Sequence, residues 1–271
     1  MTGNTMGRAL LRVVAAVAVV LGMAAAAAAQ GTTGVILMHG KQSSPNTAGL
    51  RDIASKAEAA GMKVVVPSMP WGSGGWEKIN VTPDQVFAMI DGYASQLRAQ
   101  GAQRIVVGGQ SLGANVALAY AVARQNVAGV VMAAPGHSPG GSYRNNPSIK
   151  EAIDRAMQLV QSGQASQSFS GPDDNQGNSI RMSTTAGVYA SWLNPRGQAS
   201  MPAQAPLLPA NIPVMLIIGT KDPNFNFAEA NIYKPAAKNP YSRYLVIDGG
   251  DHRNTDQAAS QRIVDWIKGL P

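Results

Sequence analysis

The stretch of sequence that decides the fold is RIVVGGQSLGANVALAYAVAR, residues 104–124. It begins with β-branched residues typical of a buried strand and ends in an alanine-rich run that favours a helix. Between them, residues 109–113 (GQSLG) have the pattern G-x-S-x-G. The two glycines permit a sharp strand-to-helix turn that holds the Ser111 hydroxyl out of the sheet, beside a helix N-terminus. Ser111 is therefore the candidate nucleophile.

A second match to the same pattern, residues 136–140 (GHSPG), also follows a strand-like run. The residue after the nucleophile must donate its backbone N–H to the developing oxyanion, and Pro139 has no N–H. The Gly-Gly-Ser-Tyr that follows is typical of a turn rather than a helix. We therefore predict that Ser138 is not the nucleophile and lies at the hinge of an insertion.

A serine nucleophile needs a base that accepts a proton near neutral pH, which indicates a histidine. The chain has three, His39, His137 and His252. His39 follows the first predicted strand, and His137 belongs to the second serine motif. His252 comes just after the last predicted strand, in the kind of loop where an open α/β sheet gathers its reactive groups. His252 is therefore the candidate general base.

The acid that orients this histidine is expected after another strand. Asp222 comes soon after the apolar run at residues 214–218. Its rivals, Asp248 and Asp251, lie too close along the chain to His252 to approach the ring from its far side. Asp222 is therefore the third candidate catalytic residue.

The order Ser, Asp, His, with the His-Gly pair at residues 39–40 and a closing helix, resembles the α/β-hydrolase superfamily in its secreted, esterase- and lipase-like bacterial form. The resemblance covers residues 33–270. It implies that the backbone N–H groups of Lys41 and Leu112 form an oxyanion hole, with His39 shaping the loop. The chain has no room for the two strands that precede this one in larger members, so we expect a sheet of about six strands.

Short apolar runs alternate with helix-like segments, which predicts a doubly wound, mostly parallel α/β sheet covered by helices on both faces. Strands are expected at residues 34–38, 63–66, 104–107, 129–133, 214–218 and 244–247. Helices are expected at residues 49–60, 83–100, 113–124 and 256–270, with caps at Asn46, Thr82 and Thr255.

Residues 136–212 interrupt this alternation and are predicted to form a lid-like insertion. Helices are expected within it at residues 148–160 and 184–193. The stretch between them, residues 162–179, is rich in Gln, Ser and Gly, which favours a mobile segment.

Residues 1–29 have the layout of a secretory signal peptide, in which Arg8 and Arg12 precede an apolar run that ends in alanines. An uncleaved membrane anchor is the alternative, but the apolar run at residues 13–29 is short for a bilayer span and ends in small alanines rather than in a flanking charge. We therefore predict an exported protein, periplasmic or extracellular, with one hydrolase domain over residues 30–271. No stable membrane association is expected after cleavage.

Composition argues against several functions. The chain has 22 Lys and Arg, 15 Asp and Glu, three His and no Cys. The basic residues are scattered rather than interleaved with aromatic residues, so no nucleic-acid partner is expected. Structural zinc is not expected without thiolates. The chain has no glycine-rich dinucleotide loop or phosphate loop, so no cofactor is predicted.

Soft and aromatic side chains near the strand ends indicate an apolar substrate pocket, for which Trp71 and Trp192 are the candidates. Such a pocket suits a small-molecule ester with a medium acyl or aromatic group, whereas an inward-turned Lys41 favours an anionic substrate. The predicted function is carboxylic-ester hydrolysis through an acyl-enzyme. A peptidase, thioesterase or acyltransferase with the same triad stays open, as does a non-catalytic envelope binding protein.

Overall fold

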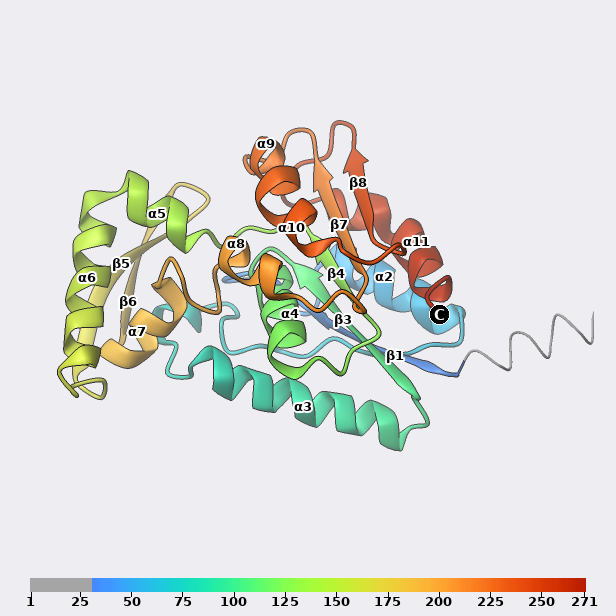
Figure 1. Cartoon of the computed structure of the whole chain (residues 1–271), viewed down its shortest axis with the longest axis horizontal. Helices are drawn as coiled ribbons and strands as arrows, with labels where there is room; N and C mark the ends of the chain where they lie inside the picture. Colours follow the sequence, from blue (N-terminus) through green and yellow to red (C-terminus); the bar gives the residue numbers. More distant parts are fainter. Residues whose placement is uncertain (1–30) are drawn as a thin grey trace, which may run out of the picture.

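A computed structural model describes residues 31–271, so the predicted signal peptide lies outside the described residues. At its centre is a six-stranded sheet with the order β2-β1-β3-β4-β7-β8 (Figure 1). Every pair of neighbouring strands is parallel. The strands are β1 (Thr33–Met38), β2 (Lys63–Val65), β3 (Arg104–Gln110), β4 (Gly129–Ala133), β7 (Val214–Gly219) and β8 (Arg243–Ile247). The predicted α/β fold with a small parallel sheet is confirmed.

Helices cover both faces of this sheet (Figure 1). One face packs against α2 (Ala48–Ala59) and α11 (Thr255–Lys268), and the other against α3 (Pro83–Ala99) and α4 (Leu112–Arg124). Successive side chains of β3 alternate between the two cores, so that Val106 lies with α2 and α11, and Val107 with α3 and α4. Because both faces are buried, the strand sequences are continuously apolar.

Of the three predicted helix caps, only Thr82 acts as one. Its hydroxyl accepts a hydrogen bond in a capping box at the start of α3. Thr47, not Asn46, precedes α2, and it makes no side-chain cap bond. Asn254 precedes α11, so Thr255 is its first residue. The helices are nevertheless where the apolar periodicity predicts them, because their buried faces stabilise them more than any single cap does.

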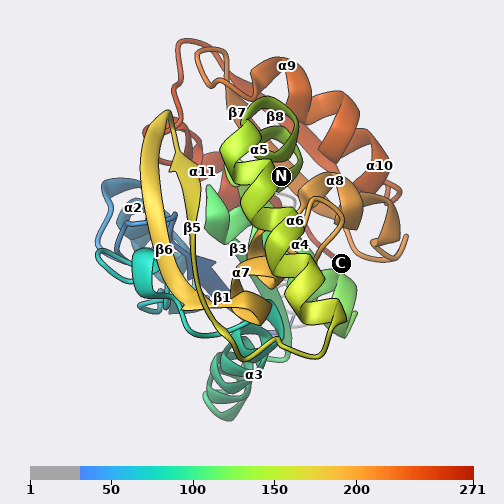
Figure 2. The same cartoon turned by 90° about the vertical axis from the view of Figure 1, so that its left-hand side faces the viewer.

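Between β4 and β7 the chain forms a group of elements at one end of the sheet. These are α5 (Pro139–Asn145), α6 (Pro147–Gln161), β5 (Ser168–Asn175), β6 (Asn178–Thr185), α7 (Ala186–Leu193) and α8 (Met201–Gln204). Strands β5 and β6 pair as an antiparallel hairpin. Figure 2 looks onto this group and shows the hairpin beside α6.

The hairpin corrects the expectation of a mobile segment at residues 162–179. Buried residues alternate with half-buried ones along β5 and with exposed ones along β6. The buried residues include Phe169, Ile180 and Met182. Such alternation is the pattern of a half-buried sheet, but its few apolar residues leave the stretch polar on average. Composition therefore concealed a regular structure.

Helix α5 corrects a second expectation, because residues 140–143, which were expected to form a turn, lie within it. Pro139 stands at the start of this helix, where a fixed φ and a missing N–H do no harm. Ser138 precedes it, where the chain leaves the sheet for the hairpin and its helices.

None of the helices within residues 31–271 is long and apolar enough to cross a membrane. Shorter helical segments are η1 (Trp76–Lys78), η2 (Ala205–Leu207), α9 (Phe225–Ala228), η3 (Glu229–Tyr233) and α10 (Lys234–Ala236).

Candidate active site

Ser111 stands on a sharp turn between β3 and α4, with φ 56° and ψ −121°. A positive φ is strained for a residue with a side chain and is typical of functional positions. A Cβ on Gly109 would lie 2.6 Å from the Gly113 carbonyl carbon, and one on Gly113 would lie 2.7 Å from that of Met38. The Ser111 N–H donates to the carbonyl of Ala133 at 3.0 Å. The glycines of the motif are therefore required by close backbone packing around the serine.

The structure brings the three candidate catalytic residues together. Ser111 Oγ lies 3.0 Å from His252 Nε2, and His252 Nδ1 lies 2.8 Å from Asp222 Oδ2. The three residues are 6 %, 7 % and 4 % exposed, in the order serine, histidine and aspartate. With a neutral imidazole, Asp222 holds the proton on Nδ1, so Nε2 is free to accept the proton of the serine hydroxyl. This arrangement can activate the serine as a nucleophile.

Neighbouring groups hold the histidine and the aspartate in place. The amide of Gln110 donates from Nε2 to the His252 carbonyl at 2.8 Å. The second carboxylate oxygen of Asp222 accepts the Asn224 N–H at 2.8 Å. Each member of the pair is thus fixed by a contact from outside it, which is the support that an oriented catalytic group requires.

Gly136 keeps the space above the candidate nucleophile open. A Cβ at this position would lie 2.7 Å from His252 Cε1 and would also contact Ser111 Oγ. The glycine belongs to the second serine motif, whose serine forms no hydrogen bond with a histidine among residues 31–271. The second serine motif therefore does not supply the candidate nucleophile, but it supplies part of the wall of this site.

The two predicted oxyanion donors come from the loop after β1 and from the start of α4, directly after Ser111. Among residues 31–271, no acceptor is found for the backbone N–H groups of Lys41 and Leu112. Leu112 is the first residue of α4, where N–H groups lack an intrahelical partner. Lys41 lies in the loop after β1, and it lines one cavity together with Ser111. Both N–H groups are free to bind an oxygen of a ligand.

His39 holds the loop that carries Lys41. Its Nε2 accepts the Met69 N–H at 3.0 Å, and its carbonyl accepts the indole N–H of Trp71 at 2.8 Å. Nδ1 lies 2.9 Å from the carbonyl of Gly40. Burial lowers the pKa of His39, and the backbone contact to Gly40 only partly offsets this. The residue is a neutral structural histidine, in agreement with the role that the family resemblance implies.

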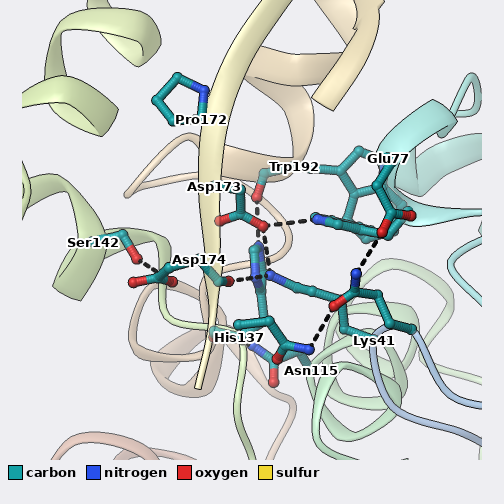
Figure 3. Close-up of polar contacts among 12 residues, drawn as sticks. Lys41, Glu77, Asn115, His137, Ser142, Pro172, Asp173, Asp174 and Trp192 are labelled. Atoms are coloured by element: carbon teal, nitrogen blue, oxygen red, sulfur yellow. Dashed lines mark hydrogen bonds and ion pairs between the residues drawn. The ribbon is translucent and has the colours of Figure 1, made fainter. Parts of the chain in front are cut away.

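The Lys41 side chain forms a buried ion pair with the hairpin (Figure 3). Its Nζ lies 2.6 Å from Asp173 Oδ2 and donates to the backbone carbonyl of Asp174 at 3.0 Å. The two paired side chains are only 4 % and 1 % exposed. The indole N–H of Trp76 donates to the same carboxylate oxygen at 2.8 Å, and the ammonium lies 4.6 Å from the Trp76 ring centroid. Because the charge of Lys41 is neutralised, the sequence-based argument for an anionic substrate no longer applies.

His137 belongs to the same buried cluster (Figure 3). Its Nε2 lies 3.0 Å from the Trp192 carbonyl, and its own carbonyl accepts the Asn115 amide at 2.6 Å. Burial, followed by the charge of Lys41, lowers the pKa of His137 to about 4. His137 is therefore neutral near pH 7 and holds the start of the insertion.

Trp71 and Trp192 do not line the cavity at the serine, and the prediction that they bind substrate is wrong. Both are 0 % exposed. Their indole N–H groups donate to the carbonyls of His39 and Val81 at 2.8 and 2.7 Å, and their rings pack edge to face at 5.9 Å. Large aromatic surfaces with a satisfied N–H are more stable in a core than in an open pocket.

The cavity beside Ser111 has a volume of about 260 Å³. None of the residues that line it carries an aliphatic, Phe, Tyr or Trp side chain, which corrects the expectation of an apolar pocket. Sequence analysis missed Asp173, Asp174 and Asn224, which belong to no motif. The two aspartates lie in the stretch that was expected to be mobile, and Asn224 precedes the short helix α9. Within residues 31–271 no group of three or more His, Asp or Glu side chains could hold a metal ion.

The fold is shared with solved structures that include two lipolytic enzymes. A monoacylglycerol lipase of Paleococcus ferrophilus is 19 % identical, with a TM-score of 0.61 over 88 % of this chain and 96 % of that one. Est1E of Butyrivibrio proteoclasticus, solved with ferulic acid, is 14 % identical, with a TM-score of 0.60 over 87 % and 88 % of the two chains. A metagenome-derived lipolytic enzyme from the work on LipS and LipT is 18 % identical, with a TM-score of 0.56 over 87 % and 91 %.

At these identities the structural likeness establishes the fold alone. A search of the curated proteins finds no match. The model of the alpha/beta hydrolase family, however, matches residues 35–266, which is most of the sequence. The chain therefore belongs to the alpha/beta hydrolase family.

Proposed function

We propose that this protein hydrolyses a carboxylic ester through an acyl-enzyme, with Ser111 as nucleophile, His252 as general base and Asp222 as the acid that orients it. The observation that carries the proposal is the unbroken pair of hydrogen bonds, 3.0 and 2.8 Å, that ends on a serine at φ 56°. A backbone strain of this kind costs about 1–3 kcal/mol, which a merely structural serine does not require. Membership of a hydrolase family supports the same chemistry.

The reaction proceeds in two halves. Ser111 Oγ attacks the ester carbonyl carbon while its proton passes to His252 Nε2, and the N–H groups of Lys41 and Leu112 stabilise the oxyanion. His252 then returns the proton to the departing alcohol, and the acyl group stays on the serine. In the second half, His252 takes a proton from water as the water oxygen attacks the acyl carbon. It then returns that proton to Ser111 Oγ as the bond between Oγ and the acyl carbon breaks and the acid leaves. Asp222 stabilises the imidazolium in both halves.

Covalent labelling with a fluorophosphonate tests the proposal, because the probe phosphonylates only an activated serine. We expect label on the unchanged protein and on Ser138→Ala, and none on Ser111→Ala. Ser138 is the matched control, since it lies in the second serine motif and lines the same cavity. Failure of the folded, unchanged protein to take label would refute the proposal and favour a binding protein on a hydrolase fold.

The export of the protein also stays a proposal, based on residues 1–29 of the sequence. Expression of the full chain in a bacterial host, followed by mass determination of the protein in the periplasm and medium, tests it. We expect a chain that begins at or near Gln30. An intact N-terminus on a membrane-bound protein would instead support the anchor.

A further inference from the structure

We infer that the cavity beside Ser111 receives a small polar group with hydrogen-bond donors, a hydroxyl or an ammonium, and that Asp174 is the carboxylate that selects it. The inference rests on the proposed ester hydrolysis, since it names the substrate class of the same site. It separates this protein from hydrolases that prefer long, lipid-like acyl chains.

The first argument for this inference is the polar lining of the cavity. Apart from the candidate nucleophile, the side chains around it are those of hydrogen-bonding residues, among them Ser138, Ser142, Asn145, Asp174, Asn175 and Asn224. The volume of about 260 Å³ lies just below the ~300–1,000 Å³ typical of ligand pockets. The cavity therefore admits a small group and offers it hydrogen bonds on several sides.

The second argument for this inference is the charge of Asp174. The ammonium of Lys41 forms its ion pair with the neighbouring residue, Asp173. From Asp174 it contacts only the backbone carbonyl, to which it donates at 3.0 Å. The Asp174 carboxylate accepts a hydrogen bond from Ser142 Oγ at 3.1 Å, and it forms no ion pair with any residue of the described chain. In Figure 3 this carboxylate lies on the side of Ser142, away from Lys41. The cavity thus contains an uncompensated, half-buried negative charge.

Solvation decides which ligand suits such a cavity. An aliphatic chain would displace water from a carboxylate and several amides without replacing its hydrogen bonds, which is unfavourable. A hydroxyl or an ammonium replaces the water and forms a charge-assisted bond to the carboxylate. An anionic group would be repelled. A neutral or cationic polar group is therefore the ligand that the cavity favours.

The surroundings of this cavity differ from side to side. A narrow cavity of about 10 Å³ adjoins it and is lined in part by Met201, Phe227 and Ile232, which leaves little room for an acyl chain. A larger cavity, of about 450 Å³, shares Lys41, Asn175 and Gln176 with the first. Its other lining residues include Gln42 and Arg253, and none is aliphatic or aromatic. A substrate that extends from the first cavity into this larger one meets further hydrogen-bonding groups, which suits an ester of a hydroxylated compound.

Two series of esters test the inference, because they vary the acyl and the alcohol group separately. The acyl series consists of the 4-nitrophenyl esters of butyrate, 3-hydroxybutyrate, 3-aminobutyrate and octanoate. The alcohol series compares propyl acetate with glycerol monoacetate. In at least one series we expect kcat/KM for the donor-bearing ester to exceed that of its plain analogue by about ten- to a hundredfold. The series that shows this preference identifies the group that enters the cavity, and the comparison of hydroxyl with amine identifies the donor.

The substitution Asp174→Asn connects the preference to the carboxylate. It keeps the shape of the side chain and removes its charge, so we expect the ratio of kcat/KM values to fall by about tenfold, and further for an amine than for a hydroxyl. Glu151→Gln is the matched control, because it removes an exposed carboxylate of α6 outside the cavity, and we expect it to preserve the ratio. Circular dichroism checks that both variants are folded.

The outcomes separate the inference from the proposed function. If neither series shows a preference for the donor-bearing ester, or if Asp174→Asn leaves the ratio unchanged, the inference is wrong and the proposed function stands. If Ser111 takes no fluorophosphonate and no ester of either series is hydrolysed, the proposed function fails and the inference fails with it.

Discussion

Replacing Asp173 with asparagine removes one partner of an ion pair that joins the loop after β1 to the hairpin. Because the paired side chains are 4 % and 1 % exposed, the Lys41 ammonium would stay buried without a counter-charge. Removal of one partner of a buried pair costs about 3–5 kcal/mol, a large part of the ~5–15 kcal/mol that stabilises a typical protein. Asparagine can still accept the Trp76 N–H, so we expect the lower end, about 3 kcal/mol. For a chain of this size that corresponds to a fall in unfolding temperature of about 6–12 °C.

Thermal unfolding followed by circular dichroism measures this effect, and a second variant assigns it to the charge. Lys41→Met combined with Asp173→Asn removes both charges, so the double variant should recover most of the lost stability. Asp154→Asn is the matched control, because it breaks an exposed ion pair with Lys150 and should leave the unfolding temperature almost unchanged. An Asp173→Asn variant that unfolds within about 1 °C of the unchanged protein would refute the reasoning, because the pair would then add little stability.

Three further predictions concern the site and its surroundings. Gly136→Ala should lower kcat/KM in an ester assay by about a hundredfold or more, because its Cβ would clash with the nucleophile and with His252. Gly140→Ala is the control and should stay active, because its Cβ makes only an ordinary van der Waals contact with Arg144. Asp222→Asn should lower kcat by about 10⁴-fold, because the amide favours the wrong tautomer of His252. Single-turnover kinetics measure this effect. A decrease in rate of less than about tenfold would contradict the role assigned to Asp222. The pKa of His137 is lowered from 6.5 to about 4 by burial, so the unfolded chain binds its proton first as the pH falls. Stability attributable to His137 should therefore decline by about 3 kcal/mol between pH 6.5 and 4. Urea unfolding across this range should show a shallower decline in His137→Gln, and equal slopes in the two proteins would exclude this origin.

Local patterns were sufficient to predict the candidate triad. Each of its members follows a strand that is continuously apolar, and the carboxyl ends of parallel strands meet at one edge of a sheet. The order of elements along the chain therefore implied that Ser111, Asp222 and His252 approach one another. Their actual contact, at 3.0 and 2.8 Å, depends on packing that no local pattern describes.

The hairpin was beyond such reasoning because its apolar residues are few and alternate with polar ones. Asp173 lies 132 residues from Lys41 along the chain, and nothing near either residue indicates the other. Trp71 and Trp192 were assigned wrongly for the same reason. The sequence indicates that an aromatic residue lies near a strand end, but it does not show whether other aromatic rings enclose that residue. Both errors concern contacts between distant segments.

The sequence by itself determined the fold class, the six strands and the strained serine turn, because these follow from hydrophobic periodicity and from the conformational freedom of glycine over a few neighbouring residues. The tertiary structure alone decided that the cavity is polar, that Lys41 is neutralised and that Asp174 keeps an unpaired charge. The physical reason is that burial and charge compensation are properties of side chains from several elements at once. They exist only after α5, the hairpin and the loop after β1 have packed together.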